Sequence, residues 1–282
     1  MNIRYIRYVS DLHLDRQAKP FSETFKDKFP ETDLDSETVL VVAGDVDEQK
    51  YWRNANEFLD LYANRFHSVI IVLGNHDYWG RNIDNRLLQT KSVVASYGNV
   101  YVLENESITI DGVVFSGCTL WTDMMNGDPL VMFDAKSIMN DFKYIRTHSY
   151  VRRFSPEYWL NLNILSREWL FRTLNDPEKS DLIHVVVTHH APTYESVDPK
   201  YRQTEKQILA NAYYCNNLDN KICYAEAKNI IWIHGHCHNT SKYEVGDKCK
   251  VYSNPLGYPQ EFNPDYDPCA IISLSSMRYA ND

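Results

Sequence analysis

The sequence predicts an α/β fold with a largely parallel sheet, and three observations predict it. Short apolar runs recur along the chain, helical stretches separate some of them, and no repeat or Pro/Gly/Ser-rich linker divides the 282 residues. Strand, helix and strand at this spacing indicate βαβ units. We therefore expect a single domain over residues 1–282.

Five apolar runs are the predicted strands that matter most for function. Four of the five are rich in β-branched residues and too short for helices, so they are typical of buried strands, whereas Arg7 interrupts the first. The five runs are residues 5–9, 39–43, 69–73, 184–188 and 230–233. Further strands are expected within 101–110 and at 113–117, 250–254 and 270–274, the last two at a mixed sheet edge.

Two helices are predicted between the early strands. Between residues 52 and 66 the apolar side chains recur at steps of three and four, which gives one apolar stripe. A second helix is expected over 84–97, with Gly98 placed to end it. We interpret residues 124–180, mostly helical in pattern, and the Tyr-rich residues 193–228 as insertions around the mouth of a site; ordinary core or surface packing is the alternative.

Composition and charge exclude several classes of protein. The net charge of −9 argues against binding to extended nucleic acid or to an anionic membrane, because both need a basic face. No apolar run approaches the ~18 residues of a membrane helix, and residues 1–10 do not resemble a signal peptide. The six cysteines form no CxxC pair, so we expect a reducing, cytoplasmic setting.

Each of the five main strands ends in a polar cluster, and seven of the ten histidines lie in these clusters. Loops at the carboxyl ends of neighbouring strands in an α/β sheet converge on one crevice. We therefore expect these side chains to meet there. The candidate site residues are Asp11, His13, Asp45, Asn75, His76, His189, His236 and His238.

Aspartate and histidine together favour Mn, Fe, Co or Zn over Ca or Cu(I). Two such ions ~3.5–4 Å apart need a ligand that bridges them, and a carboxylate can do so. Asp45 is the natural bridge, because its neighbour Gly44 lets the backbone turn sharply. Each cluster alone has an ordinary structural explanation, such as a turn or a buried histidine pair, but their joint occurrence after five strands indicates a metal site. In the His189-His190 doublet we prefer His189, with His190 as the alternative.

These clusters resemble the five motifs of the calcineurin-like metallophosphoesterases, in the same order and over residues 11–238. The matching segments are Asp11-x-His13, Gly44-Asp45, Gly74-Asn75-His76-Asp77, His189 and Gly235-His236-Cys237-His238. The resemblance implies a four-layer α/β/β/α sandwich with a dinuclear metal centre where the strands of the two sheets end. The helical insertions interpreted above would then lie near the active site.

The resemblance also implies roles for the site residues. One ion would be held by Asp11, His13, Asp45 and His238, and the second by Asp45, Asn75, His189 and His236. His76 would stand beside the ions without binding them, as a catalytic residue with Asp45. We expect two divalent ions, with Mn²⁺ as the first choice and Fe, Zn or Co as alternatives.

The sequence departs from the phosphoprotein phosphatases of this superfamily, which read Gly-Asp-x-x-Asp-Arg and Gly-Asn-His-Glu. Here Glu48 and Gln49 replace the Asp-Arg pair, and Asp77 replaces the glutamate. These departures disfavour a phosphoprotein substrate and favour the looser bacterial-type branch. They leave Glu48 and Asp47 as candidates to orient His76.

The predicted function is metal-dependent hydrolysis of phosphoric mono- or diesters. Hydroxide between the two ions would attack phosphorus in line, and His76 would protonate the leaving oxygen. The expected substrate is a phosphorylated small molecule or a nucleotide-like compound. Two alternatives are a nuclease, which the net charge of −9 disfavours, and a non-catalytic interaction scaffold, which the complete ligand set disfavours.

Overall fold

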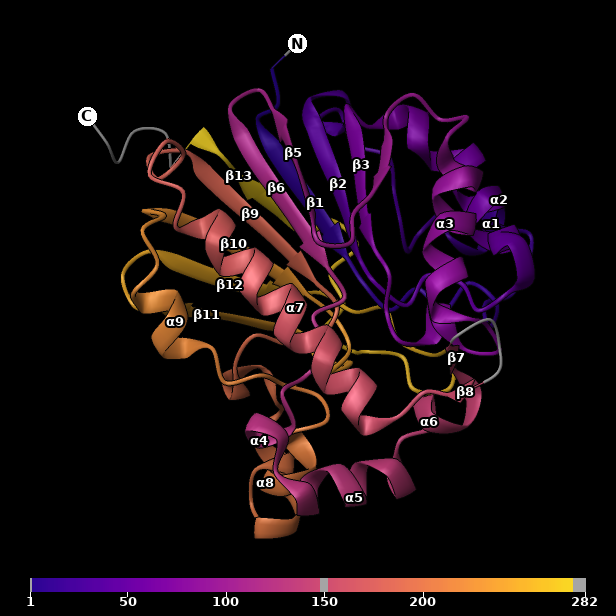
Figure 1. Ribbon diagram of the computed structural model, residues 1–282. Helices are drawn as coiled ribbons and strands as arrows, with labels where there is room; N and C mark the ends of the chain where they lie inside the picture. Colours follow the sequence, from indigo (N-terminus) through magenta and orange to yellow (C-terminus); the bar gives the residue numbers. More distant parts are fainter. Residues whose placement is uncertain (1, 148–151, 276–282) are drawn as a thin grey trace.

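Two β-sheets pack face to face between two layers of helices in the computed structural model, which describes residues 2–147 and 152–275 (Figure 1). The first sheet has the order β13-β1-β2-β3-β4 and the second β11-β12-β10-β9-β6-β5. The predicted α/β class and the four-layer sandwich are confirmed. The strands of the first sheet are β1 (Tyr5–Val9), β2 (Thr38–Ala43), β3 (Ser68–Val72), β4 (Val100–Val102) and β13 (Ile271–Ser273). Those of the second are β5 (Glu106–Ile110), β6 (Val113–Cys118), β9 (Ile183–Thr188), β10 (Asn229–His234), β11 (Ser241–Val245) and β12 (Cys249–Ser253).

The central strands of both sheets run parallel, and antiparallel strands form three of the four edges, whereas the parallel strand β4 forms the fourth. β1 to β4 pair in parallel register, and so do β6, β9, β10 and β12, whereas β13, β5 and β11 are antiparallel. All six residues of β2 and of β9 are buried, which explains their continuous apolar sequence. Consequently the carboxyl ends of β1, β2 and β3 lie at one edge of their sheet, as those of β9 and β10 do in theirs.

Three apolar layers hold the sandwich together. Alternate residues of the strands, such as Val41 in β2 and Val185 in β9, form the core between the sheets. The other faces carry residues such as Val42, which packs with Phe58 of α2, and Trp232, which packs with Leu170 of α7. The helices are α1 (Phe21–Thr24), α2 (Arg53–Tyr62), α3 (Ile83–Val94), α4 (Met124–Gly127), α5 (Pro129–Ile138), α6 (Asp141–Tyr144), α7 (Pro156–Leu174), α8 (Glu205–Asn211) and α9 (Asp219–Cys223).

The segments interpreted as insertions divide between the layers and one end of the molecule. α7 packs against the second sheet, whereas α4, α5 and α8 gather beyond the carboxyl ends of the strands (Figure 1). A two-stranded antiparallel sheet, β7 (Arg146–Thr147) and β8 (Arg152–Arg153), lies beside α6. The region 101–110, in which strands were expected, contains the end of β4 and all of β5. These two strands belong to different sheets, and residues 103–105 connect them. Within the described ranges, no helix combines the length and apolarity that a bilayer span requires.

Candidate metal centre

The five polar clusters follow the strand ends of both sheets and meet between them. Residues 11 and 13 follow β1, residue 45 follows β2, residues 75 and 76 follow β3, residue 189 follows β9, and residues 236 and 238 follow β10. Each loop therefore begins on a buried strand that fixes its position. The structure brings all eight predicted site residues to this one place.

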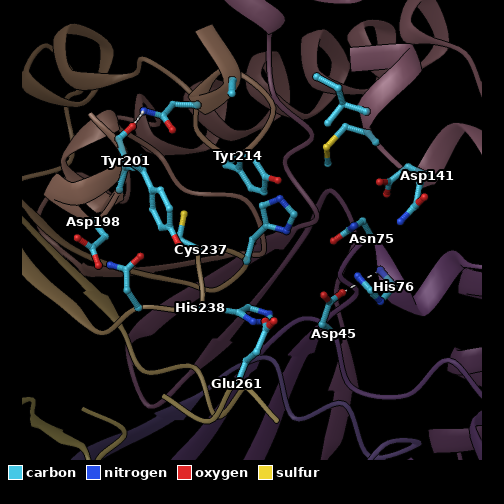
Figure 2. A pocket seen from close by; sticks show the side chains of 18 of the residues that line it. Asp45, Asn75, His76, Asp141, Asp198, Tyr201, Tyr214, Cys237, His238 and Glu261 are labelled. Atoms are coloured by element: carbon cyan, nitrogen blue, oxygen red, sulfur yellow. Dashed lines mark hydrogen bonds between the residues drawn. The ribbon is translucent and has the colours of Figure 1, made fainter. Parts of the chain in front are cut away.

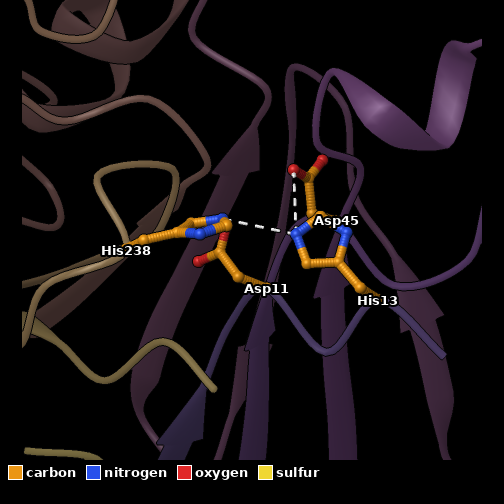
Figure 3. Close-up of side chains that lie close together, drawn as sticks. All are labelled: Asp11, His13, Asp45 and His238. Atoms are coloured by element: carbon orange, nitrogen blue, oxygen red, sulfur yellow. Dashed lines mark hydrogen bonds and ion pairs between the residues drawn. The ribbon is translucent and has the colours of Figure 1, made fainter. Parts of the chain in front are cut away.

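Four donors form the first cluster: Asp11, His13, Asp45 and His238 (Figure 3). The Nε2 atoms of His13 and His238 lie 3.3 Å apart, and His238 Nε2 lies 3.3 Å from Asp11 Oδ1. His13 Nε2 is 3.8 Å from Asp45 Oδ2. Ligand atoms of all four residues lie within 4.8 Å of one another, which is the spacing around a single ion.

Asp45 also belongs to a second cluster, with His189 and His236. Its other oxygen, Oδ1, lies 3.3 Å from His189 Nε2, and Asn75 Oδ1 lies 3.0 Å from the same nitrogen. The two oxygens of one carboxylate thus face two different groups of donors. This arrangement suits a carboxylate that bridges two ions.

The backbone at the site adopts the left-handed region that residues other than glycine rarely occupy. Such a conformation costs of order 1–3 kcal/mol per residue and persists only where the surrounding structure imposes it. Here it turns side chains of successive loops into the same space. The residues concerned are Asp11 (φ 52°), His13 (φ 41°), Asp45 (φ 54°), His236 (φ 68°) and His238 (φ 51°).

Two glycines make room for the functional side chains. A Cβ at Gly74 would lie 2.1 Å from Asp45 Oδ1, and a Cβ at Gly44 would lie 2.2 Å from His189 Nδ1. Gly44 also has a φ of +87°, which disfavours any other residue. The glycines of these two motifs are therefore required by the close packing of Asp45 and His189.

Asp77 ties the loop after β2 to the loop after β3. Its fully buried carboxylate accepts hydrogen bonds from the backbone N–H groups of Val46, Asp47 and Gly74 and from Trp52 Nε1, at 2.8–3.2 Å. Burial, reinforced by the charge of Asp45, raises the pKa of Asp77 to about 6. Asp77 therefore holds loops together and does not touch the donors' shared space.

Charge balance at the site depends on its histidines. Burial would raise the pKa values of Asp11 and Asp45, but His238 beside Asp11 and His189 beside Asp45 lower both, that of Asp45 well below its usual range. Conversely, although burial would lower it, the Asp45 carboxylate raises the pKa of His189 to about 10. A proton on His189 thus provides positive charge that a divalent cation at the same place would supply.

The residues present fit a pair of divalent cations. The donors are carboxylate and amide oxygens and imidazole nitrogens, the set that Mn, Fe, Co and Zn share. His236 Nε2 is buried without a hydrogen-bond partner, and burial together with His190 lowers the pKa of His236 well below its usual range. A neutral ring then offers an unused lone pair to an ion. His189 donates from Nδ1 to the carbonyl oxygen of Ala43 at 3.0 Å, which turns its Nε2 toward Asp45.

The contacts of the two neighbouring histidines, His189 and His190, show which of them belongs to the site. His189 lies among the donors, whereas His190 directs Nδ1 at the carbonyl oxygen of Thr119, 3.2 Å away, and packs between Trp121 and Trp159. Burial, followed by the charge of His189, lowers the pKa of His190 to about 3. The sequence preference for His189 agrees with this placement.

His76 stands at the edge of the site and is held by a carboxylate. Its Nδ1 lies 2.6 Å from Glu48 Oε1, whereas Asp47 accepts from the first turn of α2 and faces away. Burial would lower the pKa of His76, but the carboxylates of Asp45 and Glu48 raise it. Of the two candidates, Glu48 is therefore the partner of His76.

Two aromatic side chains that the sequence reasoning missed complete the surroundings of His76. The Trp79 ring stacks on His76 with centroids 3.7 Å apart, and the Tyr258 hydroxyl lies 3.2 Å from His76 Nε2. Tyr258 also stacks on His13 at 4.1 Å. In the sequence, Tyr258 directly follows the segment Asn254-Pro255-Leu256-Gly257, which is typical of a rigid turn but indicates no role in a site.

A pocket of about 590 Å³ opens over the donors (Figure 2). Its floor includes Asp45, His76 and His238, and its walls come from residues 138–141, 197–214 and 258–261. Parts of both segments interpreted as insertions thus line the pocket. The site is accessible to a small molecule from this side.

Residues 5–240 match the model of the family described as calcineurin-like phosphoesterase. The chain belongs to this family, as its motifs indicated, and it is a metal-dependent hydrolase of phosphoric ester bonds. Together with the two donor clusters, the family supports a dinuclear metal centre.

Three relatives show how far the similarity extends. The uncharacterized protein L509 of Acanthamoeba polyphaga mimivirus is 24% identical over 295 residues, which cover 99% of this chain and all of the viral protein. The phosphopantetheinyl hydrolase PptH of Mycobacterium tuberculosis has a TM-score of 0.68 at 17% identity and covers 97% of both chains. A dimetal phosphatase of Danio rerio has a TM-score of 0.47 at 10% identity, over 92% of this chain and 88% of its own.

Proposed function

We propose that the chain hydrolyses phosphoric mono- or diesters of small molecules at a centre of two divalent cations. Asp11, His13, Asp45 and His238 hold one ion, and Asp45, Asn75, His189 and His236 hold the other. The observation that carries this proposal is the position of Asp45, whose two oxygens face the two clusters. Mn²⁺ is the first candidate, with Fe, Zn and Co as alternatives, because the donor set suits all four.

The two ions, when bound, lower the pKa of water between them and withdraw charge from the phosphoryl oxygens. The protein's own side chains hold the donors in place and position the ester. Asp45 fixes the spacing of the two donor groups, because its carboxylate is held by the backbone N–H of His76 at 2.9 Å. The pocket walls position the ester above the donors, which removes much of the entropic cost of the reaction.

His76 protonates the leaving oxygen. Glu48 accepts from Nδ1, so that Nε2, which faces the pocket beside Tyr258, is the nitrogen that carries the transferable proton when the ring is cationic. A raised pKa keeps more of the ring protonated near neutral pH, which suits a general acid. We also propose a reducing, cytoplasmic setting, which the six unpaired cysteine thiols support.

Turnover of two chromogenic esters tests the function. The purified chain should hydrolyse p-nitrophenyl phosphate or bis-p-nitrophenyl phosphate with added Mn²⁺ and lose this activity after chelation. Activity on neither ester, with ions bound, would favour the non-catalytic scaffold; tight, salt-dependent binding to long DNA would favour the nuclease.

The role of His76 is tested with a series of leaving groups. The variant His76→Ala should keep its ions and lose about 10²–10⁴-fold in turnover of alkyl phosphates, whose leaving groups need a proton. Nitrophenyl esters, whose leaving groups are stable as anions, should lose far less. An equal loss on both classes would remove the general-acid assignment.

A further inference from the structure

Apart from the histidines of the site, the ionisable side chains that give the pocket wall its charge are acidic. Three acidic side chains line it, Asp141, Asp198 and Glu261, and none of the described lining residues is Lys or Arg. Asp198 is already paired, since Lys200 Nζ lies 2.8 Å from its Oδ2. Neither Asp141 nor Glu261 forms an ion pair of ordinary length with another described residue. Burial raises the pKa of Asp141, whereas the Asn75 side chain and the charge of His76 lower it.

Asp141 is the residue of this wall that can bind a particular chemical group of the substrate. It lies at the start of α6, it is 1% exposed, and its carboxylate faces the pocket above Asn75 and His76 (Figure 2). One oxygen, Oδ1, accepts a long hydrogen bond from Trp79 Nε1 at 3.4 Å. The other oxygen, Oδ2, is buried and accepts no hydrogen bond of ordinary length, although the Asn75 side chain is near enough to lower the pKa of Asp141.

A buried carboxylate oxygen without a partner is unfavourable, because it has lost its water and gained no donor. A ligand with an N–H or O–H group at this point would supply the missing donor. A second anionic group at the same point would instead face Asp141 inside the pocket and Glu261 at its exposed rim. Like charges brought together in this way repel each other, which disfavours binding of the doubly anionic ligand.

Building on the proposed hydrolysis, we infer that the substrates are phosphoesters whose alcohol part carries a hydrogen-bond donor, cationic or uncharged, and no second anionic group. The donor binds Asp141, while the single phosphate is neutralised at the metal centre. Among the predicted substrates, this specificity disfavours nucleotides with more than one phosphate. Glu261 strengthens the preference for a cationic group from the rim of the pocket.

Three small esters of similar size measure this specificity: phosphoethanolamine, glycerol phosphate and phosphoglycolate, whose alcohol parts are cationic, neutral and anionic. We expect kcat/KM to fall in that order, and the value for phosphoethanolamine to be at least about tenfold higher than that for phosphoglycolate. Asp141→Asn should reduce this ratio to near unity, and Glu261→Gln should reduce it in part. Asp134→Asn, which alters an exposed acid of α5 outside the pocket lining, should leave it unchanged.

A binding measurement separates this inference from the proposed hydrolysis. In an NMR titration that requires no turnover, ethanolamine should bind the wild-type chain more tightly than glycolate, and Asp141→Asn should remove the difference. If esters are hydrolysed but phosphoglycolate is used as well as phosphoethanolamine, the specificity is wrong and the hydrolysis stands. If no ester is hydrolysed but the binding preference and its loss in Asp141→Asn are found, the proposed hydrolysis is wrong, whereas the preference of the pocket for a ligand with a donor group stands. Equal binding of both probes would overturn the specificity.

Discussion

Gly74 offers a direct test of how closely the site is packed. The variant Gly74→Ala adds one methyl group, which would lie 2.1 Å from Asp45 Oδ1 and 2.7 Å from His189 Cε1. The methyl group would also lie 2.4 Å from the backbone nitrogen of Asp45. Ordinary van der Waals contact begins near 3.4 Å, so the Asp45 carboxylate has to move by about 1.3 Å and its backbone by about 1 Å. Catalytic groups must be held within about 0.5 Å of their productive positions.

A displacement of this size should disrupt both donor clusters, because Asp45 belongs to each. Misplacement by about 1 Å costs roughly 10²-fold in rate, so we expect kcat to fall by about that factor. The variant should also bind its ions more weakly. Steady-state turnover of bis-p-nitrophenyl phosphate and the metal content after dialysis measure the two effects.

Gly98→Ala is the matched control. A Cβ at Gly98 meets no heavy atom within 4 Å, so that variant should keep its activity and its ions. Thermal unfolding of both variants shows whether the fold is intact. Wild-type turnover and metal content in a folded Gly74→Ala variant would refute the packing argument.

The remaining predictions concern three side chains around the centre. Glu48→Gln removes a carboxylate that raises the pKa of His76, so His76 should lose its proton at lower pH. The alkaline limb of the pH–rate profile should therefore shift to lower pH. An unmoved limb would argue against His76 as the titrating acid. Asp77→Asn places an amide N–H donor against backbone N–H donors, so the free energy of unfolding, measured with denaturant, should fall by about 1–3 kcal/mol. An unchanged free energy of unfolding would contradict the role of Asp77. His189→Ala should retain one ion and lose the other, as counted by elemental analysis; retention of both would exclude His189 as a ligand.

Much of the fold and most of the candidate site could be predicted from the sequence, for a physical reason. Buried parallel strands need continuous apolar runs, and their loops must meet at one edge of the sheet. Asp45 and Asn75 each follow such a run after a glycine that close packing requires. The candidate metal ligands can therefore be recognised from short local motifs.

Other features depend on contacts between distant segments and were not predictable. Arg7 interrupts the first apolar run, yet it is buried because it donates to the carbonyl oxygen of Pro30 at 2.8 Å and lies over the Phe29 ring. Asp141 belongs to no motif and reaches the pocket only because α6 folds back over the loop after β3. Trp79 likewise has no feature in the sequence that separates it from a core residue, because its stacking on His76 arises only in the fold.

The number of ions bound per chain tests the central claim most directly. The chain is stripped by chelation, supplied with excess Mn²⁺, dialysed and analysed for manganese, while turnover is followed on the same samples. The account predicts two ions per wild-type chain, activity that rises with their binding, and loss of both ions in Asp45→Ala, because one carboxylate serves both clusters. Full activity in the stripped chain, or unchanged manganese content in Asp45→Ala, would contradict it.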